Sequence, residues 1–383
     1  MKKAVVTGVA STRVGDLEGS TCLGLHTEAA MAAARDAGIA LSDIDGVLCA
    51  YSLVEPQVML SSAFCEYVGL QPRYSTTISM GGVTGAMLVM HAAMLVESGH
   101  CRHVLVATGD NRLSGLRGTG VATISATGTS AQHEYIYGLS VPAAYALVAR
   151  RYMHEYGLTP EHLAAFAVTQ RGYAARHPLA HYRKPITLAD VMASRPIATP
   201  LHLLDCCPMS DGGAAVIVSA ADAARDTAKP RVSVLGAGQG HTHEHLIAAP
   251  SLTEFGCRHS AAEAFGRAGV TAADIDVAEI YDSFTITLAV ELESMGFFEK
   301  GEAGPAALAG ELESGGRLPC NTHGGLLSYG HSGAAGGLFH FVEAVEQLRG
   351  QSGERQVKGA ELAFVHGDGG ILSGHCSIVL GRN

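Results

Sequence analysis

Two stretches that lie far apart in the chain repeat one pattern, and this repeat constrains the fold more than any other feature. AGIALSDIDGV begins at Ala37 and AGVTAADIDVA begins at Ala268, and both place Asp-Ile-Asp at the same distance after an Ala-Gly pair. Each stretch follows a helix-like segment and precedes a strand-like one. The interval between them is far too long for the repeat of a solenoid. The sequence therefore predicts two copies of one α/β unit.

The segments around the first copy alternate between strand-like and helix-like patterns. Short apolar runs are typical of buried strands, whereas an alanine-rich segment that ends in glycine and a longer segment that is apolar on nearly every face are typical of helices. We expect strands at about 2–12, 45–51 and 101–110, with helices at 24–39 and 85–100. The second unit is expected to begin with a strand at 231–240 and to end in the apolar run at 361–383.

The region between the two units has a different character. It carries polar and proline-containing stretches such as ARHPLAHYRKP, together with the helix-like PAAYALVARRYMHEYG. Long excursions of this kind often place binding residues over a rigid scaffold. We therefore predict an N-terminal half at 1–230, which includes a loop domain at about 111–200, and a C-terminal half at 231–383.

Composition excludes several classes of partner. Apolar residues make up 47% of the chain and charged residues 16%, a balance typical of a deeply buried globular protein or a tight oligomer. A net charge of -10 without tryptophan or a basic run argues against nucleic acid and anionic membranes. The nine cysteines have irregular spacing, and the opening MKKAVVTGVA is typical of a strand rather than a signal peptide. We expect a cytoplasmic protein with reduced thiols that binds a small molecule or a protein partner.

Two short motifs suggest ligand sites, but neither has the context that such a site needs. GAGQG at 236–240 lacks the third glycine and the helix start of a dinucleotide site. HTHEH at 241–245 has histidines at alternate positions, yet no carboxylate or cysteine spacing supports a metal site there. We interpret HTHEH as a polar loop near an entrance and expect no metal site. The absence of Gly-x-Ser-x-Gly and phosphate-loop motifs argues against hydrolases and ATPases.

Four glycine-rich or polar turns stand where strands should meet helices or other strands. They are SMGGVTGAM (79–87), EIYDSF (279–284), NTHGGLLSYGHSGAAGG (321–337) and VHGDGG (365–370). Glycine permits positive φ and lets backbone N–H groups approach a ligand closely, which suits a site that stabilises an oxyanion. Because His331 and Tyr281 lie in these turns, we expect the four turns to form one site.

These motifs resemble those of the thiolase superfamily, and in particular its sterol-carrier-protein-type branch. NTHGGLLSYGHSGAAG resembles the Asn-Thr-His-Gly-Gly segment of that branch, which ends in Gly-His-Pro, with Ser332 where proline is usual. MSDGGAAVIV at 209–218 resembles the entry to a strand of the family, and ARRYMHEYG resembles its loop-region helix. The resemblance implies an α/β fold of two βαβαβαββ halves in a five-layer αβαβα sandwich, with an inserted loop domain and a homodimer.

The chain departs from the family at the positions that carry its chemistry. The resemblance places the nucleophilic cysteine of a thiolase at Gly82, where no sulfur is present. The branch's proton-shuttling cysteine is replaced by Ser283 in Tyr-Asp-Ser-Phe, and the alternative Cys-x-Gly turn ends at Gly367 without a cysteine. The resemblance implies that His331 is the activating histidine, and Tyr281 adds a phenol. Covalent acyl transfer needs a thiolate or an equivalent nucleophile.

Three functions follow from this pattern. The first is an atypical acyltransferase that acts on an acyl-CoA at the carbon-carbon bond next to the thioester. The second is a retro-aldolase that cleaves a β-hydroxyacyl-CoA, with His331 as base and Tyr281 as donor or orienter, because thiolase-like aldolases of steroid side chains share a Tyr-Asp-x-Phe motif. The third is a non-catalytic scaffold subunit. The resemblance implies coenzyme A as part of the substrate, no tightly bound cofactor, and a small OB-fold and zinc-ribbon protein as a partner.

Overall fold

The protein is organised around one nine-stranded mixed sheet, seen in a computed structural model that describes residues 3–224 and 229–382. The strand order is β3-β2-β4-β7-β1-β8-β11-β10-β9. The first five strands in this order come from the N-terminal part of the chain: β1 (Ala4–Ser11), β2 (Gly46–Ala50), β3 (Tyr74–Ile78), β4 (His103–Asn111) and β7 (Asp211–Ala220). β2 runs parallel to β3 and β4, whereas β7 is antiparallel to β4 and β1.

The C-terminal strands repeat this arrangement with one strand fewer. They are β8 (Val232–His241), β9 (Val277–Ile280), β10 (Leu362–Gly369) and β11 (Gly374–Arg382). β9 corresponds to β2. No counterpart of β3 lies beside β9 in the described residues; at that edge, Ala278 forms only an isolated parallel bridge with Cys320. A short antiparallel pairing of β1 with β8 joins the two halves.

Helices divide the structure into five layers, which confirms the predicted fold class. α1 (Cys22–Ala37) and α2 (Leu60–Val68) cover the outer face of the first half, and α3 (Thr84–Glu97) and α12 (Gly336–Arg349) lie between the halves. α9 (Cys257–Ala268) and α10 (Thr285–Ser294) cover the outer face of the second half. α3 and α12 are buried because both of their faces meet strands, which explains the absence of a polar face in the sequence of α3.

Both copies of the sequence repeat form the same local structure. Each helix ends at the alanine of the Ala-Gly pair, and the glycine that follows is left-handed, with φ 67° at Gly38 and 73° at Gly269. A 3-10 turn and a strand come next in both copies. The last aspartate of each copy binds the start of the neighbouring parallel strand: Asp45 accepts the N–H of His103, and Asp276 accepts the N–H of Leu362. The repeated Asp-Ile-Asp therefore sets the register of two equivalent strand pairs.

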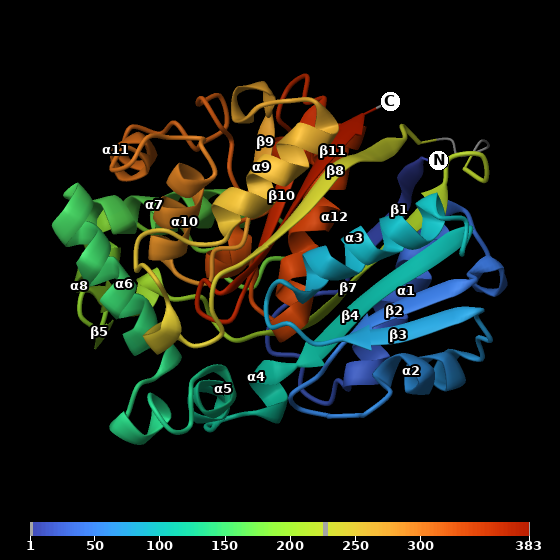
Figure 1. Ribbon diagram of the computed structural model, residues 1–383, viewed down its shortest axis with the longest axis horizontal. Helices are drawn as coiled ribbons and strands as arrows, with labels where there is room; N and C mark the ends of the chain where they lie inside the picture. Colours follow the sequence, from blue (N-terminus) through green and yellow to red (C-terminus); the bar gives the residue numbers. More distant parts are fainter. Residues whose placement is uncertain (1–2, 225–228, 383) are drawn as a thin grey trace.

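The middle of the chain forms a mostly helical region that packs against the C-terminal half (Figure 1, green). It comprises α4 (Arg112–Gly115), α5 (Gly120–Gly128), α6 (Val141–Tyr156), α7 (Pro160–Ala175), α8 (Leu188–Ala193), β5 (Pro196–Ala198) and β6 (Leu201–His202). α7 also contacts α10 and α11 (Ala303–Leu308). The domain boundaries near residues 111, 200 and 230 stay predictions. Within the described residues, no helix combines the length and the apolar character that crossing a membrane requires.

The two glycines of α9 and its cap give a matched stability test. Alanine has open space at both positions, but only Gly269 has a left-handed backbone. We expect Gly269→Ala to lower the free energy of unfolding by about 1 kcal/mol or more, because a Cβ is strained at positive φ. Gly266→Ala, inside the helix, should raise it by about 0.5 to 1 kcal/mol. Thermal unfolding of the two variants measures the difference, and an equal response of both would contradict it.

Candidate active site

A cavity of about 500 Å³ opens between the loop region and the junction of the two halves. All four glycine-rich or polar turns contribute to its wall, through Met80 to Gly82, Tyr281, His331 and Asp368 to Gly370 among others. The loop region covers the cavity with apolar side chains of Val121, Ile124 and Val141. The cavity is therefore the candidate active site.

A tyrosine occupies the space in which a nucleophile would stand. The phenol oxygen of Tyr281 lies 2.7 Å from Nε2 of His331, within hydrogen-bond distance. A Cβ built on Gly82 would come within 2.1 Å of that oxygen and 2.4 Å of the carbonyl oxygen of Asp368. No side chain fits at position 82 unless both Tyr281 and the backbone at Asp368 move. The phenol thus stands opposite His331, where the resemblance implied a thiol.

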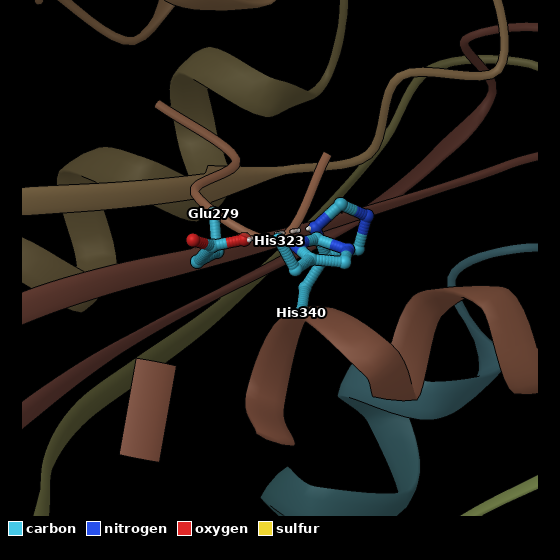
Figure 2. A group of neighbouring side chains, drawn as sticks. All are labelled: Glu279, His323 and His340. Atoms are coloured by element: carbon cyan, nitrogen blue, oxygen red, sulfur yellow. Dashed lines mark hydrogen bonds and ion pairs between the residues drawn. The ribbon is translucent and has the colours of Figure 1, made fainter. Parts of the chain in front are cut away.

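The segment before Tyr281 is held by the Asn-Thr-His motif. The side chain of Asn321 accepts the N–H of Ile280 at 2.6 Å and donates to its carbonyl at 2.7 Å, so it pairs with β9 as a strand would. Thr322 donates to Glu279 through both its backbone N–H and its hydroxyl, each at 2.9 Å. Figure 2 shows the other oxygen of Glu279 facing His323 and His340, at 2.9 Å and 3.4 Å from their Nδ1 atoms. All these groups are buried, and they fix the end of β9, directly before Tyr281 in the chain.

Asp282 fixes the chain on the other side of Tyr281. Its buried carboxylate accepts the N–H of Leu326 at 2.6 Å and the N–H of Leu327 at 3.4 Å. A Cβ on Gly325 would lie 2.0 Å from this carboxylate, so the turn needs glycine here for both its space and its φ of 59°. Burial nevertheless raises the pKa of Asp282 well above its usual value. Glu279 before Tyr281 and Asp282 after it thus anchor the chain on both sides of the phenol.

His331 is positioned by the Met-Ser-Asp-Gly-Gly motif. Ser210 donates its N–H to the carbonyl of His331 at 2.9 Å, and its hydroxyl oxygen accepts the N–H of His331 at 3.3 Å. Asp211 accepts the backbone N–H groups of Leu113 at 2.8 Å and Leu17 at 2.9 Å, which ties two loops to the same place. The motif therefore holds His331 in place, and its Met209 also lines the cavity.

The small residues after His331 allow two helices to meet beside Gly82. A Cβ on Gly337 would lie 2.6 Å from the carbonyl oxygen of Gly82, and a Cβ on Gly85 would lie 2.9 Å from the N atom of Leu338. The starts of α3 and α12 can approach this closely only with glycine at both positions.

The remaining predicted site residues have different surroundings. Ser283 lines the cavity, and its hydroxyl is buried. Gly367 does not line the cavity; a Cβ there would contact Val83, directly before α3, and Ala86 of α3. The next residues, Asp368 to Gly370, form the wall instead. His241 and Glu244 of HTHEH also line the cavity, so this segment lies beside the site as a polar loop would.

Several cavity residues were not identified from the sequence. Tyr145 stacks on Phe284 with ring centroids 4.3 Å apart and donates to Asp368 at 3.1 Å. Arg112 brings a buried guanidinium to the wall, and Cys207 brings a thiol. Tyr145 and Arg112 come from the loop region, whose family-like stretch ARRYMHEYG contains neither residue. Cys207 is one of the nine irregularly spaced cysteines, and a spacing of this kind predicts reduced thiols without marking any of them as a site residue.

Burial determines the protonation states in the cavity. Loss of water around His331, together with the charge of Arg112, lowers the pKa of His331 to about 3, so the imidazole is neutral at physiological pH. Burial, Cys207 and Asp368 raise the pKa of Tyr281 well above 10, so the phenol keeps its proton. A neutral imidazole beside a protonated phenol can accept a proton, and Arg112 favours negative charge on a bound substrate.

The five-layer fold and this cavity define the class of the protein, an α/β enzyme of the thiolase type. A family model described as "Thiolase, N-terminal domain" matches residues 3–222, and one described as "Thiolase C-terminal domain-like" matches residues 238–382. The chain therefore belongs to the thiolase superfamily.

Curated relatives and solved structures agree with this assignment. An acetyl-CoA acetyltransferase of Methanothermobacter thermautotrophicus is 35% identical over 97% of both chains. A steroid side-chain-cleaving aldolase of Thermomonospora curvata is 36% identical over 91% of both chains. The solved Ltp2-ChsH2(DUF35) aldolase has a TM-score of 0.88 at 33% identity and covers 99% of this chain and 98% of its own. The relatives thus include both acyltransferases and aldolases.

The contact between Gly82 and Tyr281 predicts a coupled response to mutation. We expect Gly82→Ala to destabilise the protein by about 1 to 3 kcal/mol, because the new methyl group overlaps the phenol. The same substitution in a Tyr281→Ala background should cost less, since the obstructing ring is gone. Thermal unfolding of the two single variants and the double variant measures the coupling. Additive losses would show that Tyr281 does not obstruct position 82.

Proposed function

We propose that this chain is a retro-aldolase that cleaves the Cα–Cβ bond of a β-hydroxyacyl-CoA. One observation carries the proposal: the phenol of Tyr281, 2.7 Å from His331, fills the place beside Gly82 in which a thiolase would hold its nucleophile. Acyl transfer through position 82 needs a nucleophile, whereas aldol cleavage needs only an acid-base pair and a site for an enolate.

The pair supplies the proton transfers of this reaction. The substrate hydroxyl gives its proton to the oxygen of Tyr281 as Tyr281 passes its own proton to Nε2 of His331. The Cα–Cβ bond breaks, its electron pair forms the thioester enolate, and the former β-carbon leaves as a ketone or aldehyde. The same pair then returns the proton to Cα, so no net proton is gained or lost. Arg112, in the cavity wall, stabilises the negative charge of the enolate.

The relatives support the acyl-CoA class, and the local geometry favours one member of it. Overall identity does not separate the two activities, because the acetyltransferase is 35% identical and the aldolase is 36% identical. Tyr281 beside Gly82 is the feature that favours the aldolase. The apolar side chains of Val121, Ile124 and Val141 suit a substrate with a bulky apolar acyl group.

Acyl transfer remains a second candidate because Cys207 lines the same cavity. Burial and the charges of Cys206 and Asp282 raise the pKa of Cys207 far above its ordinary value, which keeps the thiol protonated and weakly nucleophilic. Intact mass measured during turnover separates the two routes. An acyl adduct that disappears in Cys207→Ala would replace the aldolase proposal with a covalent one.

We also propose a small DUF35 protein as the partner, since the Ltp2-ChsH2(DUF35) aldolase carries such a protein in its name. The sequence resemblance likewise implied a small partner protein. The homodimer, the cytoplasmic location and the absence of a tightly bound cofactor stay predictions. If the chain neither cleaves nor transfers an acyl group with the partner present, the scaffold function replaces both proposals.

Turnover should depend on both members of the pair of His331 and Tyr281. With a β-hydroxyacyl-CoA and the partner present, His331→Ala and Tyr281→Phe should each lower the rate of cleavage by roughly 10²- to 10⁴-fold, because each removes one step of the proton transfer. Mass spectrometry of the ketone or aldehyde and of the shortened acyl-CoA measures the rate. Tyr137→Phe is the matched control, since Tyr137 is 82% exposed and does not line the cavity. Unchanged cleavage in both site variants would overturn the proposal.

The pH dependence of cleavage should reflect the lowered pKa of His331. A histidine with the usual pKa near 6.5 would lose roughly 30-fold in its neutral fraction at pH 5. The pKa of His331 is lowered to about 3, so this histidine stays neutral throughout that range and becomes protonated only in stronger acid. We therefore expect kcat/KM for cleavage to show no loss with a midpoint near pH 6.5. A fall of kcat/KM with a midpoint near pH 6.5 would contradict the low pKa of His331.

A further inference from the structure

A second group of buried side chains lies behind the wall of the cavity. Glu291 of α10, His366 of β10 and His375 of β11 are each fully buried or nearly so, with relative exposures of 0%, 1% and 0%. The three residues come from separate elements and point their side-chain nitrogen and oxygen atoms at one another. Neither the proton transfers nor the substrate contacts proposed above use them.

The distances within this group match those of a metal centre. Nε2 of His366 lies 3.2 Å from Nδ1 of His375 and 3.5 Å from Oε1 of Glu291, and the distance from Nδ1 of His375 to Oε1 of Glu291 is 3.8 Å. Ligands about 2.0 to 2.2 Å from a tetrahedral zinc ion are separated by about 3.3 to 3.6 Å. A cation at the centre of this triangle would therefore have three ligands at ordinary bond lengths after small shifts.

Within the group, the inward-facing nitrogens of His366 and His375 lie within hydrogen-bond distance of each other, so a bound cation would replace that contact. Nδ1 of His366 is 2.8 Å from the hydroxyl of Ser377, which is the outer contact that a metal-binding histidine usually makes. Both carboxylate oxygens of Glu291 lack a hydrogen-bond partner among the described residues, although they are buried. Oδ1 of Asp368 also lacks a partner and lies 4.0 Å from Nδ1 of His375. Burial of a carboxylate without a donor or a cation is costly.

In two other groups of similar composition, the buried carboxylates have partners. In the group of Figure 2, both histidines face one oxygen of Glu279, at a hydrogen-bond distance of 2.9 Å in the case of His323, and Thr322 saturates the other oxygen. In the group of His177, Arg355 binds Glu343 at 2.9 Å. Only the group around Glu291 leaves a buried carboxylate without a donor or a cation among these three.

We propose that Glu291, His366 and His375 bind one Zn²⁺ ion, with Asp368 beside the fourth position. Two neutral imidazoles and carboxylates are a donor set that suits zinc, and the charges of Glu291 and Asp368 balance those of the ion. The ion ties α10 to β10 and β11 directly behind the turn that lines the cavity. It is therefore a structural ion that stabilises this turn and does not contact the substrate. The site departs from the sequence-based expectation that the chain binds no metal.

Metal analysis of the full chain, expressed alone in zinc-supplemented medium and dialysed, tests the site. Inductively coupled plasma mass spectrometry should find about one zinc ion per chain. The zinc content of Glu291→Gln, which keeps the shape of the side chain but removes its charge, should be lower by roughly tenfold or more. The matched control is Glu279→Gln, in the hydrogen-bonded group of Figure 2, which should retain the ion. A zinc-free wild-type chain, or equal zinc in both variants, would overturn the proposal.

A second measurement uses only the wild-type chain, in case Glu291→Gln does not fold. Removal of the ion by dipicolinate should lower the midpoint of thermal unfolding, and added Zn²⁺ should restore it, because the ion binds the folded state. Anomalous diffraction at the zinc edge should give a peak between the three side chains. A peak elsewhere, or a midpoint that responds to neither treatment, counts against the site.

Discussion

The pairing of the Asn321 side chain with the peptide of Ile280 is the interaction on which the site depends. In the N-terminal half, β2 has β3 as its neighbour; in the C-terminal half, the corresponding edge of β9 has only a bridge between Ala278 and Cys320. The amide of Asn321 supplies the hydrogen bonds that a strand would have supplied there. Because these bonds are buried, their loss would leave backbone groups of β9 without partners. The same bonds fix the position of Tyr281, the residue that follows Ile280.

The position of Tyr281 changes what the family resemblance means for this chain. The thiolase scaffold and its histidine are present, but the phenol and Gly82 are complementary in shape, and neither could be replaced by a larger group alone. His331 therefore faces a tyrosine that keeps its proton. Such a pair favours proton transfer to and from a substrate over activation of a thiol.

Buried charge is concentrated around the site and is compensated in different ways. Glu279 is paired with histidines and Thr322, Glu343 is paired with Arg355, and Asp282 accepts backbone N–H groups. Glu291 has none of these partners among the described residues. Removal of a buried carboxylate from water is unfavourable unless a donor or a cation replaces the water. Glu291 is thus the one of these four without such a partner in the described part of the chain, and this is the observation on which the proposed zinc site rests.

The sequence by itself determined the two-unit architecture, because Asp-Ile-Asp and the preceding glycine specify the same helix end and strand start in both copies. It also identified the four turns and the residues Gly82, Tyr281, Ser283 and His331 that line the cavity, since glycine and titratable side chains are visible without coordinates. Only the tertiary structure decided which atoms meet. The overlap of Tyr281 with position 82, the arrival of Arg112 and Tyr145 from the loop region, and the unpaired Glu291 all depend on distances between segments that no local pattern records.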